Sequence, residues 1–313
     1  MNNLLILRKT TNLNKWGDDM VNAIEIKDLV KTYGTTRGVS NISIDVKKGD
    51  FYGFIGPNGA GKSTTIRSML GLIKKNSGSI KLLGMDLEKE KVNILKKIGY
   101  IPSETMFYPR MRVSEIIKMS ADAYKMNCNE KARELCERLK VDTVKRIEDL
   151  SLGNRKKISI VCAMQHSPDL YILDEPTSGL DPLMQKEFFA LLSEANKEGV
   201  TIFFSSHVLS EIQNYCNNAA IIKDGKIIAM DSVSNLTKTN ARKVLLRGLS
   251  KAPDIKGVVG LNVEENSVSF MYQGNIKILL TALNNTEVDD VIIEEPSLEE
   301  IFMHYYEKTG ETI

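Results

Sequence analysis

The sequence predicts an α/β protein, and three segments carry this prediction. The apolar run "FYGFIG" leads into the glycine-rich stretch of residues 56–65, "GPNGAGKSTT", and a helical pattern follows it. A second apolar run, residues 170–173, ends in two carboxylates, and a third, residues 200–204, ends in Ser-Ser-His. Because ligands of open α/β sheets bind at the carboxyl ends of the strands, we expect these segments to meet at one site.

The bulk composition is that of an ordinary globular chain. Its 313 residues are 42% hydrophobic and 26% charged, with a net charge of +2, and this length predicts one large domain with a smaller one beside it. The near-neutral charge gives no reason to expect nucleic acid as a partner. The spacing of the four cysteines matches no zinc or disulfide pattern, which predicts reduced thiols in a cytosolic protein. No apolar run reaches the roughly 18 to 20 residues of a membrane-spanning helix, so any membrane role requires a partner protein.

The first residues fit neither the predicted fold nor a targeting pattern. Residues 4–7 form a short apolar run with basic residues after it, which is not the layout of a signal peptide. One hypothesis is that translation begins at Met20, because the codons for residues 16–19 must contain a purine-rich tract like a bacterial ribosome-binding site. We expect residues 1–21 to be an extension that is either disordered or not translated. A natural peptide containing Trp16, detected by mass spectrometry, would contradict the later start.

Two strands precede the glycine-rich stretch. Residues 23–34, "AIEIKDLVKTYG", alternate apolar and polar residues, which predicts a half-buried strand. The run "ISIDV" predicts a second strand, and Lys48–Gly49 a turn. The next apolar run enters Gly56 and predicts the strand before the loop.

Residues 56–64 match the pattern of a phosphate-binding loop in its strand–loop–helix context. The glycines allow backbone conformations closed to residues with a Cβ, so that successive N–H groups point inward. Lys62 is predicted to reach the β- and γ-phosphates, and the Ser63 hydroxyl to ligate Mg²⁺. The alternative, a glycine-rich turn before a helix, is disfavoured because every position of the pattern is filled. The predicted phosphate-contacting residues are Gly56, Asn58, Gly59, Ala60, Gly61, Lys62, Ser63 and Thr64.

The other two segments supply acid and base groups. Asp174, at the end of a buried strand, is predicted to hold Mg²⁺, and Glu175 to accept a proton from the attacking water. A lone acid at a strand end is often a helix cap, but the phosphate loop favours the catalytic interpretation. His207 follows the third strand and is placed to hydrogen-bond the γ-phosphate. The alternative for His207 is a capping or surface residue.

In this order, Tyr33, the phosphate loop, "LSLGN" (150–154), "YILDEP" (171–176), "SGLD" (178–181) and His207 resemble the ATP-binding subunit of an ABC transporter. The resemblance covers roughly residues 22–235 and is specific, because several separate motifs occur in the family's order. It implies a P-loop NTPase core of the ABC type with an antiparallel β subdomain. It also implies a helical subdomain, here at about residues 105–160, and the cofactors ATP and Mg²⁺.

The resemblance implies roles for four further residues. Tyr33 resembles the aromatic residue that stacks on adenine, although a surface tyrosine at a strand end is the alternative. Ser151 and Gly153 resemble the residues that complete the ATP site of the other subunit across a dimer interface. Asp181 resembles the residue that links the two opposed sites.

The chain departs from the family's pattern in two places. In "LSLGN", the signature motif of the family, Leu152 and Asn154 replace a glycine and a glutamine. We expect an altered but competent motif on two conditions: the backbone angles of Leu152 are ordinary, and its side chain turns away from nucleotide. In "GYIPSET", Ser103 stands where the family usually has a glutamine. Ser103 is shorter and could ligate Mg²⁺ only through water, while Glu104 offers a substitute. We expect this change to affect coupling more than binding.

Residues 236–313 are predicted to form a small accessory α+β domain. The segments "KVLLRGL", "VVGLNVEENSVSFMYQ" and "VDDVIIEEP" predict strands. Helices are predicted in "NIKILLTALNNT" and "SLEEIFMHYYEKTG", the latter with a capping box from Ser297 to Glu300. The ending resembles the tail of ATPases from drug- and peptide-exporting systems, which favours export over import.

We therefore expect the cytoplasmic ATPase of a two-component ABC exporter. Its predicted partners are an integral membrane permease and a second ATP-binding subunit, with a homodimer favoured over a heterodimer. The protein would lie peripherally at the cytoplasmic face of the membrane, and its ATP-driven closure would drive the permease.

Two alternatives are open at this point. A soluble ABC ATPase acting on ribosomes or DNA is disfavoured by the single phosphate loop and by the short separation of Lys62 from Asp174. An ATP-binding regulatory subunit with weak hydrolysis is supported by the changes at Leu152, Asn154 and Ser103. Glu175 and His207 argue against it.

Overall fold

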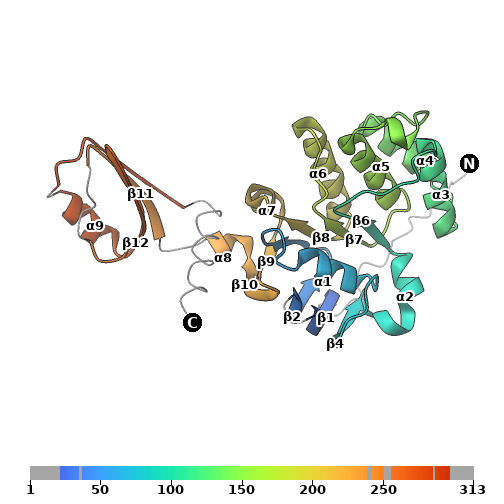
Figure 1. The fold of residues 1–313 in the computed structure, drawn as a ribbon, viewed down its shortest axis with the longest axis horizontal. Coiled ribbons are helices and arrows are strands. Elements are labelled where there is room, and N and C mark those ends of the chain that lie inside the picture. Colours follow the sequence, from blue (N-terminus) through green and yellow to red (C-terminus); the bar gives the residue numbers. More distant parts are fainter. Residues whose placement is uncertain (1–21, 35–36, 238–240, 250–254, 285, 297–313) are drawn as a thin grey trace, which may run out of the picture.

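Two β-sheets and the helices around them make up residues 22–237 of the computed structural model, and a third sheet follows (Figure 1). The structure describes residues 22–34, 37–237, 241–249, 255–284 and 286–296. The extension predicted at 1–21 and the helix predicted to begin at Ser297 lie outside the described residues. The mixture of sheets and helices confirms the predicted α/β class.

The first sheet is antiparallel, with the strand order β2-β1-β4-β5. Its strands are β1 (Asn22–Tyr33), β2 (Arg37–Lys47), β4 (Ser77–Leu82) and β5 (Met85–Asp86). Ile24 and Ile26 are buried on one face of β1, as the alternating pattern predicts. They belong to a core that also contains Phe54 and Ile66, so this sheet packs against the phosphate-loop segment.

The central sheet has the order β10-β9-β3-β8-β7-β6 and is parallel except for the edge strand β10. Its strands are β3 (Phe51–Ile55), β6 (Ile98–Ile101), β7 (Leu170–Asp174), β8 (Thr201–Ser206), β9 (Asn218–Lys223) and β10 (Lys226–Ser232). β3, β7 and β8 are buried throughout, because helices or the other sheet cover both of their faces. Ile55 pairs with Ser206, and Asp174 with Ser205, so the carboxyl ends of the three strands meet at one edge.

Five helices flank the sheets in residues 22–237, apart from the helical subdomain. They are α1 (Lys62–Met69), α2 (Leu87–Leu95), α6 (Pro182–Lys197), α7 (Leu209–Tyr215) and α8 (Val233–Thr237). α1 begins directly after the phosphate loop, and α6 follows the carboxyl end of β7. Among the described residues, no helix combines the length and the apolar character needed to cross a membrane.

The helical subdomain lies between β6 and β7 in the chain. It contains α3 (Val113–Tyr124), α4 (Asn129–Arg138), the short 3-10 helix η1 (Ile147–Asp149) and α5 (Leu152–Met164). Val113, Leu135 and Ile158 are buried in the same core as Phe204 of the central sheet. The subdomain therefore packs on the sheet, and Figure 1 shows its helices over the part of the sheet that contains β6 and β7.

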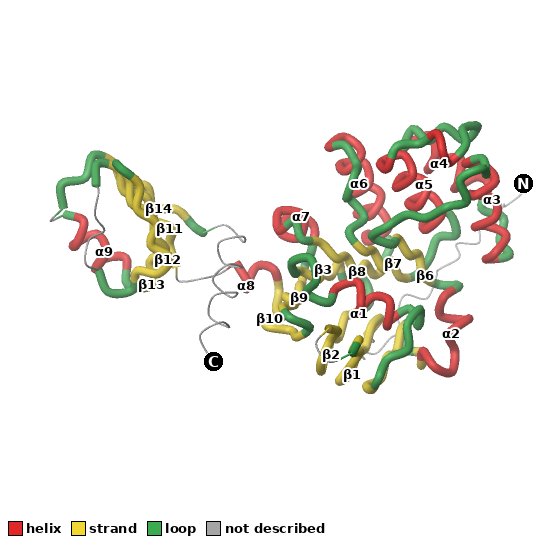
Figure 2. The backbone as a smooth tube through the Cα atoms, viewed as in Figure 1, coloured by secondary structure: helices red, strands yellow, loops and turns green. Residues whose placement is uncertain are grey.

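The C-terminal sheet is antiparallel, with the order β12-β13-β11-β14. Its strands are β11 (Ala241–Arg247), β12 (Val258–Glu264), β13 (Ser267–Gln273) and β14 (Asp290–Glu294). The helix α9 (Ile276–Leu283) lies between β13 and β14 in the chain. Val244, Phe270 and Leu279 form the centre of a separate core. Figure 2 shows this sheet and α9 as a group of their own beyond α8. These elements give the α+β composition predicted for this part of the chain.

Candidate functional site

A cavity of about 820 Å³ opens where the phosphate loop meets the ends of β1 and β7. Its lining unites residues that are far apart in the sequence, and most of them belong to the predicted site. They are Tyr33, Gly38, Pro57, Asn58, Gly59, Ala60, Gly61, Lys62, Ser63, Thr64, Glu175 and Asp224. The predicted adenine-stacking residue, Tyr33, is 47% exposed, so its ring is accessible from the cavity.

The phosphate loop has the backbone that an anion site needs. Gly59 and Gly61 have φ values of 84° and 111°, in the region that favours glycine. A Cβ on Gly61 would lie 2.6 Å from Val39 Cγ1, so glycine is also required for space. No side chain caps the start of α1, which leaves the first N–H groups of this helix for a ligand.

Lys62 joins the loop to the end of β7. Its side chain is buried, and its Nζ donates to the carbonyl oxygens of Gly56 at 2.6 Å and Pro57 at 3.1 Å. The same ammonium lies 3.1 Å from Glu175 Oε1. A cation is therefore held at the mouth of the loop, beside the carboxylate predicted to act on water.

Glu175 lies between two partners that carry or accept positive charge. Its Oε1 faces Lys62, and its Oε2 lies 3.1 Å from Nδ1 of His207. Burial alone would raise the pKa of Glu175, but the bonds and charges of Lys62 and His207 outweigh it, so the pKa is lowered. The side chain is therefore a carboxylate at neutral pH and can accept a hydrogen bond or a proton.

Asp174 carries a carboxylate oxygen without a protein partner. The residue is fully buried, and its Oδ1 accepts a hydrogen bond of 2.8 Å from Ser205 Oγ. Its Oδ2 is buried and has no hydrogen-bond partner within the described chain. A buried, unpaired carboxylate oxygen is costly unless a cation or another donor satisfies it. Asp174 itself does not line the 820 Å³ cavity, whereas its neighbour Glu175 and Ser63 do. A carboxylate oxygen and a hydroxyl are both oxygen ligands, which is the type that Mg²⁺ prefers.

The residues of the "LSLGN" motif lie at the start of α5, and the cavity lining does not include them. Ser151 is exposed and caps α5 by accepting a hydrogen bond from the Asn154 amide at 3.4 Å. A Cβ on Gly153 would lie 2.4 Å from the carbonyl oxygen of Gly179, so this glycine allows a close approach of two segments. Leu152 is the first residue of α5 and is 59% exposed. Its backbone is helical, which meets the first condition for a competent motif.

Comparisons with known proteins agree with this geometry. A family model described as "ABC transporter" matches residues 39–178. The bacitracin transport ATP-binding protein BcrA of Bacillus licheniformis is 37% identical over 302 residues, which cover 91% of this chain and 97% of that protein. The chain belongs to the family of ABC transporter ATP-binding proteins. As a member of this family, it binds and hydrolyses ATP.

Two further comparisons extend the match. The linearmycin resistance ATP-binding protein LnrL of Bacillus subtilis is 29% identical, over 93% of this chain and 99% of that protein. A solved structure described as "Structure of ATP binding subunit of ABC transporter" has a TM-score of 0.65 and 29% identity. It covers 68% of this chain and 91% of its own. The predicted ABC-type ATPase core is thereby confirmed.

Two residues of the predicted ABC site have structural contacts outside the cavity. Asp181 caps α6, since its Oδ1 accepts a hydrogen bond of 3.0 Å from the Met184 amide. The Ser103 carbonyl accepts a hydrogen bond from the Lys156 ammonium at 3.0 Å. Neither residue lines the 820 Å³ cavity. Their predicted roles in the closed dimer and at Mg²⁺ stay predictions.

The sequence pattern missed three residues of this ABC site. Ser205 donates to Asp174, and both its hydroxyl and its carbonyl oxygen accept from the Glu175 amide at 3.2 Å. Lys156 donates to the Glu175 carbonyl oxygen at 3.3 Å. Asp224, in the turn between β9 and β10, lines the cavity. Of these three residues, only Ser205 could have been found from the sequence, because it lies at the end of the predicted third strand, two residues before His207.

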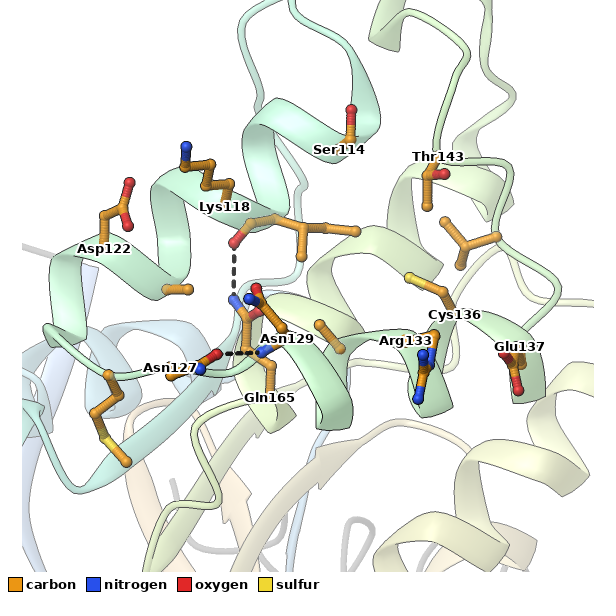
Figure 3. Close-up of a pocket in the computed structure, with 15 residues that line it drawn as sticks. Ser114, Lys118, Asp122, Asn127, Asn129, Arg133, Cys136, Glu137, Thr143 and Gln165 are labelled. Carbon is orange, nitrogen blue, oxygen red and sulfur yellow. Dashed lines mark hydrogen bonds between the residues drawn. The ribbon is translucent and has the colours of Figure 1, made fainter.

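A second cavity, of about 710 Å³, lies between α3 and α4 of the helical subdomain (Figure 3). Gln165 forms part of its lining and donates through Nε2 to the Ile117 carbonyl oxygen at 3.1 Å. The Asn129 amide donates to Asn127 Oδ1 at 3.2 Å on the same lining. The lining contains none of the predicted ATP-site residues and shares no residue with the 820 Å³ cavity.

Proposed function

We propose that this chain powers export through a separate membrane permease. The proposal that ATP hydrolysis drives the permease rests on the cluster of Lys62, Glu175 and His207 beside the phosphate loop. The direction of transport is supported by BcrA, named for bacitracin transport, and LnrL, named for linearmycin resistance. Both align over more than nine-tenths of this chain, including most of the part beyond residue 236.

The nucleotide is held by the phosphate loop. The loop N–H groups, the start of α1 and the Lys62 ammonium would bind the phosphates of ATP, and Tyr33 would stack on the adenine. Ser63 and Asp174 would hold Mg²⁺, which neutralises charge on the phosphates when it is bound. The unpaired Oδ2 of Asp174 supports this assignment.

Glu175 is proposed as the acceptor of the proton from the attacking water. Its lowered pKa keeps it ionised, and its contact with His207 orients the carboxylate. His207 is about half exposed, so it can also donate to a γ-phosphate oxygen as the site closes. Because phosphoryl transfer depends mainly on positioning and electrostatics, loss of Glu175 should slow turnover and preserve binding.

The active form is proposed to be a homodimer with two ATP sites. Ser151 and Gly153 lie on an exposed helix start outside the cavity, which supports a role at the nucleotide of a second copy. Asp181, which caps α6, would link the two opposed sites. The dimer would act at the cytoplasmic face of the membrane through its permease. The net charge of +2 gives no support for nucleic acid as a partner.

Size-exclusion chromatography of the Glu175→Gln protein, with and without MgATP, tests this proposal. Glutamine preserves the shape of the side chain and removes its ability to accept a proton, so the ATP-bound dimer should accumulate. We expect an ATP-dependent shift from monomer to dimer and a loss of turnover of at least about 100-fold, the lower range for a positioned general base. A Glu175→Gln protein that hydrolyses ATP at the normal rate would refute the catalytic role. A persistent monomer would point instead to a different partner subunit, or to closure that needs the permease.

A further inference from the structure

Lys156 is a buried lysine with all of its donors in use. It lies on α5, and its side chain is 1% exposed. Its Nζ donates to the carbonyl oxygens of Pro102 and Ser103, each at 3.0 Å, and of Glu175 at 3.3 Å. An ammonium group has three protons, so these three bonds satisfy it fully. Lysine is almost never buried without such partners.

The three acceptors of Lys156 belong to two segments that converge on the ATP site. Pro102 and Ser103 follow β6, and Glu175 follows β7. Lys156 itself lies in the second turn of α5, whose start carries Ser151 and Gly153. One ammonium therefore joins the signature helix, the loop after β6 and the end of β7.

The backbone of Glu175 has a conformation that needs such support. Its φ is 47°, in the left-handed region that side chains with a Cβ seldom occupy. Its amide donates to both oxygens of Ser205 on one side, and its carbonyl oxygen accepts from Lys156 on the other. Strained conformations of this kind persist where the surroundings hold them from several sides. Both peptide planes of Glu175 are held here, and they direct its carboxylate between Lys62 and His207.

The charges around Lys156 agree with this arrangement. Burial lowers the pKa of Lys156, while the nearby negative charges of Asp174 and Glu175 act in the opposite direction. The three carbonyl acceptors match the three protons of an ammonium group, and the two acidic residues favour its positive charge. A neutral side chain of the same size would fill the space without making these bonds.

We propose that Lys156 is a positioning residue for ATP hydrolysis, which fixes the backbone of Glu175 and ties it to the signature helix and to the loop at Ser103. This inference rests on the proposed role of Glu175 as the proton acceptor. Lys156 does not line the nucleotide cavity. Its effect is therefore expected on the rate of the chemical step and not on the affinity for ATP.

The first test replaces Lys156 by methionine in the full chain. Lys156→Met preserves volume and removes the ammonium, and Lys157→Met, on the same helix, serves as the matched control. We expect kcat to fall by about 10- to 100-fold, a part of the factor of about 10² to 10⁴ that a positioned general base contributes. The dissociation constant of a fluorescent ATP analogue should change by less than about 3-fold, and the control should match the wild type. A loss of affinity that equals the loss in kcat would overturn the proposal.

A double-mutant cycle separates positioning from general stability. If Lys156 acts through Glu175, adding Lys156→Met to Glu175→Gln should slow hydrolysis by no more than about 2-fold beyond the single Glu175→Gln variant. If the two effects multiply, Lys156 does not act through Glu175 and the proposal fails. If the Glu175→Gln protein hydrolyses ATP at the wild-type rate, the proposed role of Glu175 is refuted instead. If the Lys156→Met protein hydrolyses ATP at the wild-type rate while the Glu175→Gln protein is slow, only the proposed role of Lys156 is refuted.

A second variant keeps the proposal testable if the methionine protein folds poorly. Lys156→Arg retains the positive charge and several N–H donors. We expect it to keep kcat within about 5-fold of the wild type, because a donor can still reach the Glu175 carbonyl. Equal losses of kcat in the arginine and methionine proteins, at unchanged ATP affinity, would overturn the proposal.

Discussion

At the scale of single residues, the site depends on backbone conformation as much as on side-chain identity. Lys62, Glu175 and His207 lie in three separate motifs. The structure places Lys62 Nζ 3.1 Å from Oε1 of Glu175 and His207 Nδ1 3.1 Å from its Oε2. The left-handed φ of Glu175 is what turns its carboxylate toward both partners. A motif can specify the residue type but not this angle, because the angle is imposed by Ser205 and Lys156 from other elements.

The lowered pKa of Glu175 predicts a pH-dependent contribution to stability. In the folded state the pKa lies below its ordinary value of 4.5, so the ionised form is favoured by folding. The contribution of Glu175 is fully present above that ordinary value and is lost as the pH falls through the lowered folded value. We therefore expect Glu175→Gln to be less stable than the wild type at pH 7. The difference in the free energy of unfolding should shrink as the pH falls below 4.5.

Denaturant unfolding of both proteins between pH 7 and acid pH measures this difference. Glu104→Gln, at an exposed position near the same site, is the control, and it should match the wild type across the range. A difference that grows on acidification would mean that the pKa of Glu175 is raised in the folded protein.

At the scale of elements, close approaches between segments hold the signature helix against the end of β7. The start of α5 lies so near the loop before α6 that a Cβ on Gly153 would lie 2.4 Å from the Gly179 carbonyl oxygen. On the other side of the subdomain, Arg138 of α4 donates to Glu187 at 2.6 Å and to Glu194 on α6. The start of α5 therefore lies against the loop before α6, and α4 is joined to α6 itself by ion pairs.

The close contact at Gly153 predicts a defect in assembly. Gly153→Ala must move the start of α5 away from Gly179, because a backbone oxygen cannot yield as a flexible side chain could. In the Glu175→Gln background we expect the ATP-dependent dimer to weaken by at least about 10-fold, a change of roughly 1.4 kcal/mol in the free energy of association. Analytical ultracentrifugation with MgATP measures this constant. Lys157→Ala on the same helix is the control, and an unchanged dimer constant in Gly153→Ala would contradict the prediction.

Much of this architecture could be predicted from the sequence, for reasons that differ between elements. The β9–β10 hairpin can be predicted from "IIKDGKIIA", because Asp224 and Gly225 suit a turn that needs positive φ, and their φ values are 47° and 75°. The phosphate loop was predicted because its function requires fixed residues at fixed spacing. Lys156 was not predicted, since one lysine among several on a helix carries no pattern that marks it as buried. Its three acceptors are distant in sequence, and folding alone brings them together.

At the scale of the whole molecule, the hydrophobic core of the C-terminal sheet is separate from the two cores of residues 22–237. The cores of residues 22–237 end with Val233 and Leu236 of α8. The next core begins with Val244 and includes residues of β11, β13 and α9. Figure 1 shows the C-terminal sheet on the far side of α8 from α1 and β7. Parts of a chain with their own cores can unfold independently.

Separate cores predict that nucleotide stabilises one part of the chain and not the other. A ligand that binds the folded state at 100 times its dissociation constant stabilises it by about 2.7 kcal/mol. All residues that line the nucleotide cavity lie between Tyr33 and Asp224. The measurement uses the Glu175→Gln protein, in which bound ATP should not be hydrolysed. We therefore expect calorimetry to give two unfolding transitions, and MgATP should raise the midpoint temperature of only one of them. Lys62→Ala, which removes the phosphate-binding cation, should abolish this shift. A single transition, or an equal shift of both, would mean that the C-terminal sheet unfolds together with the ATPase core and is coupled to its nucleotide state.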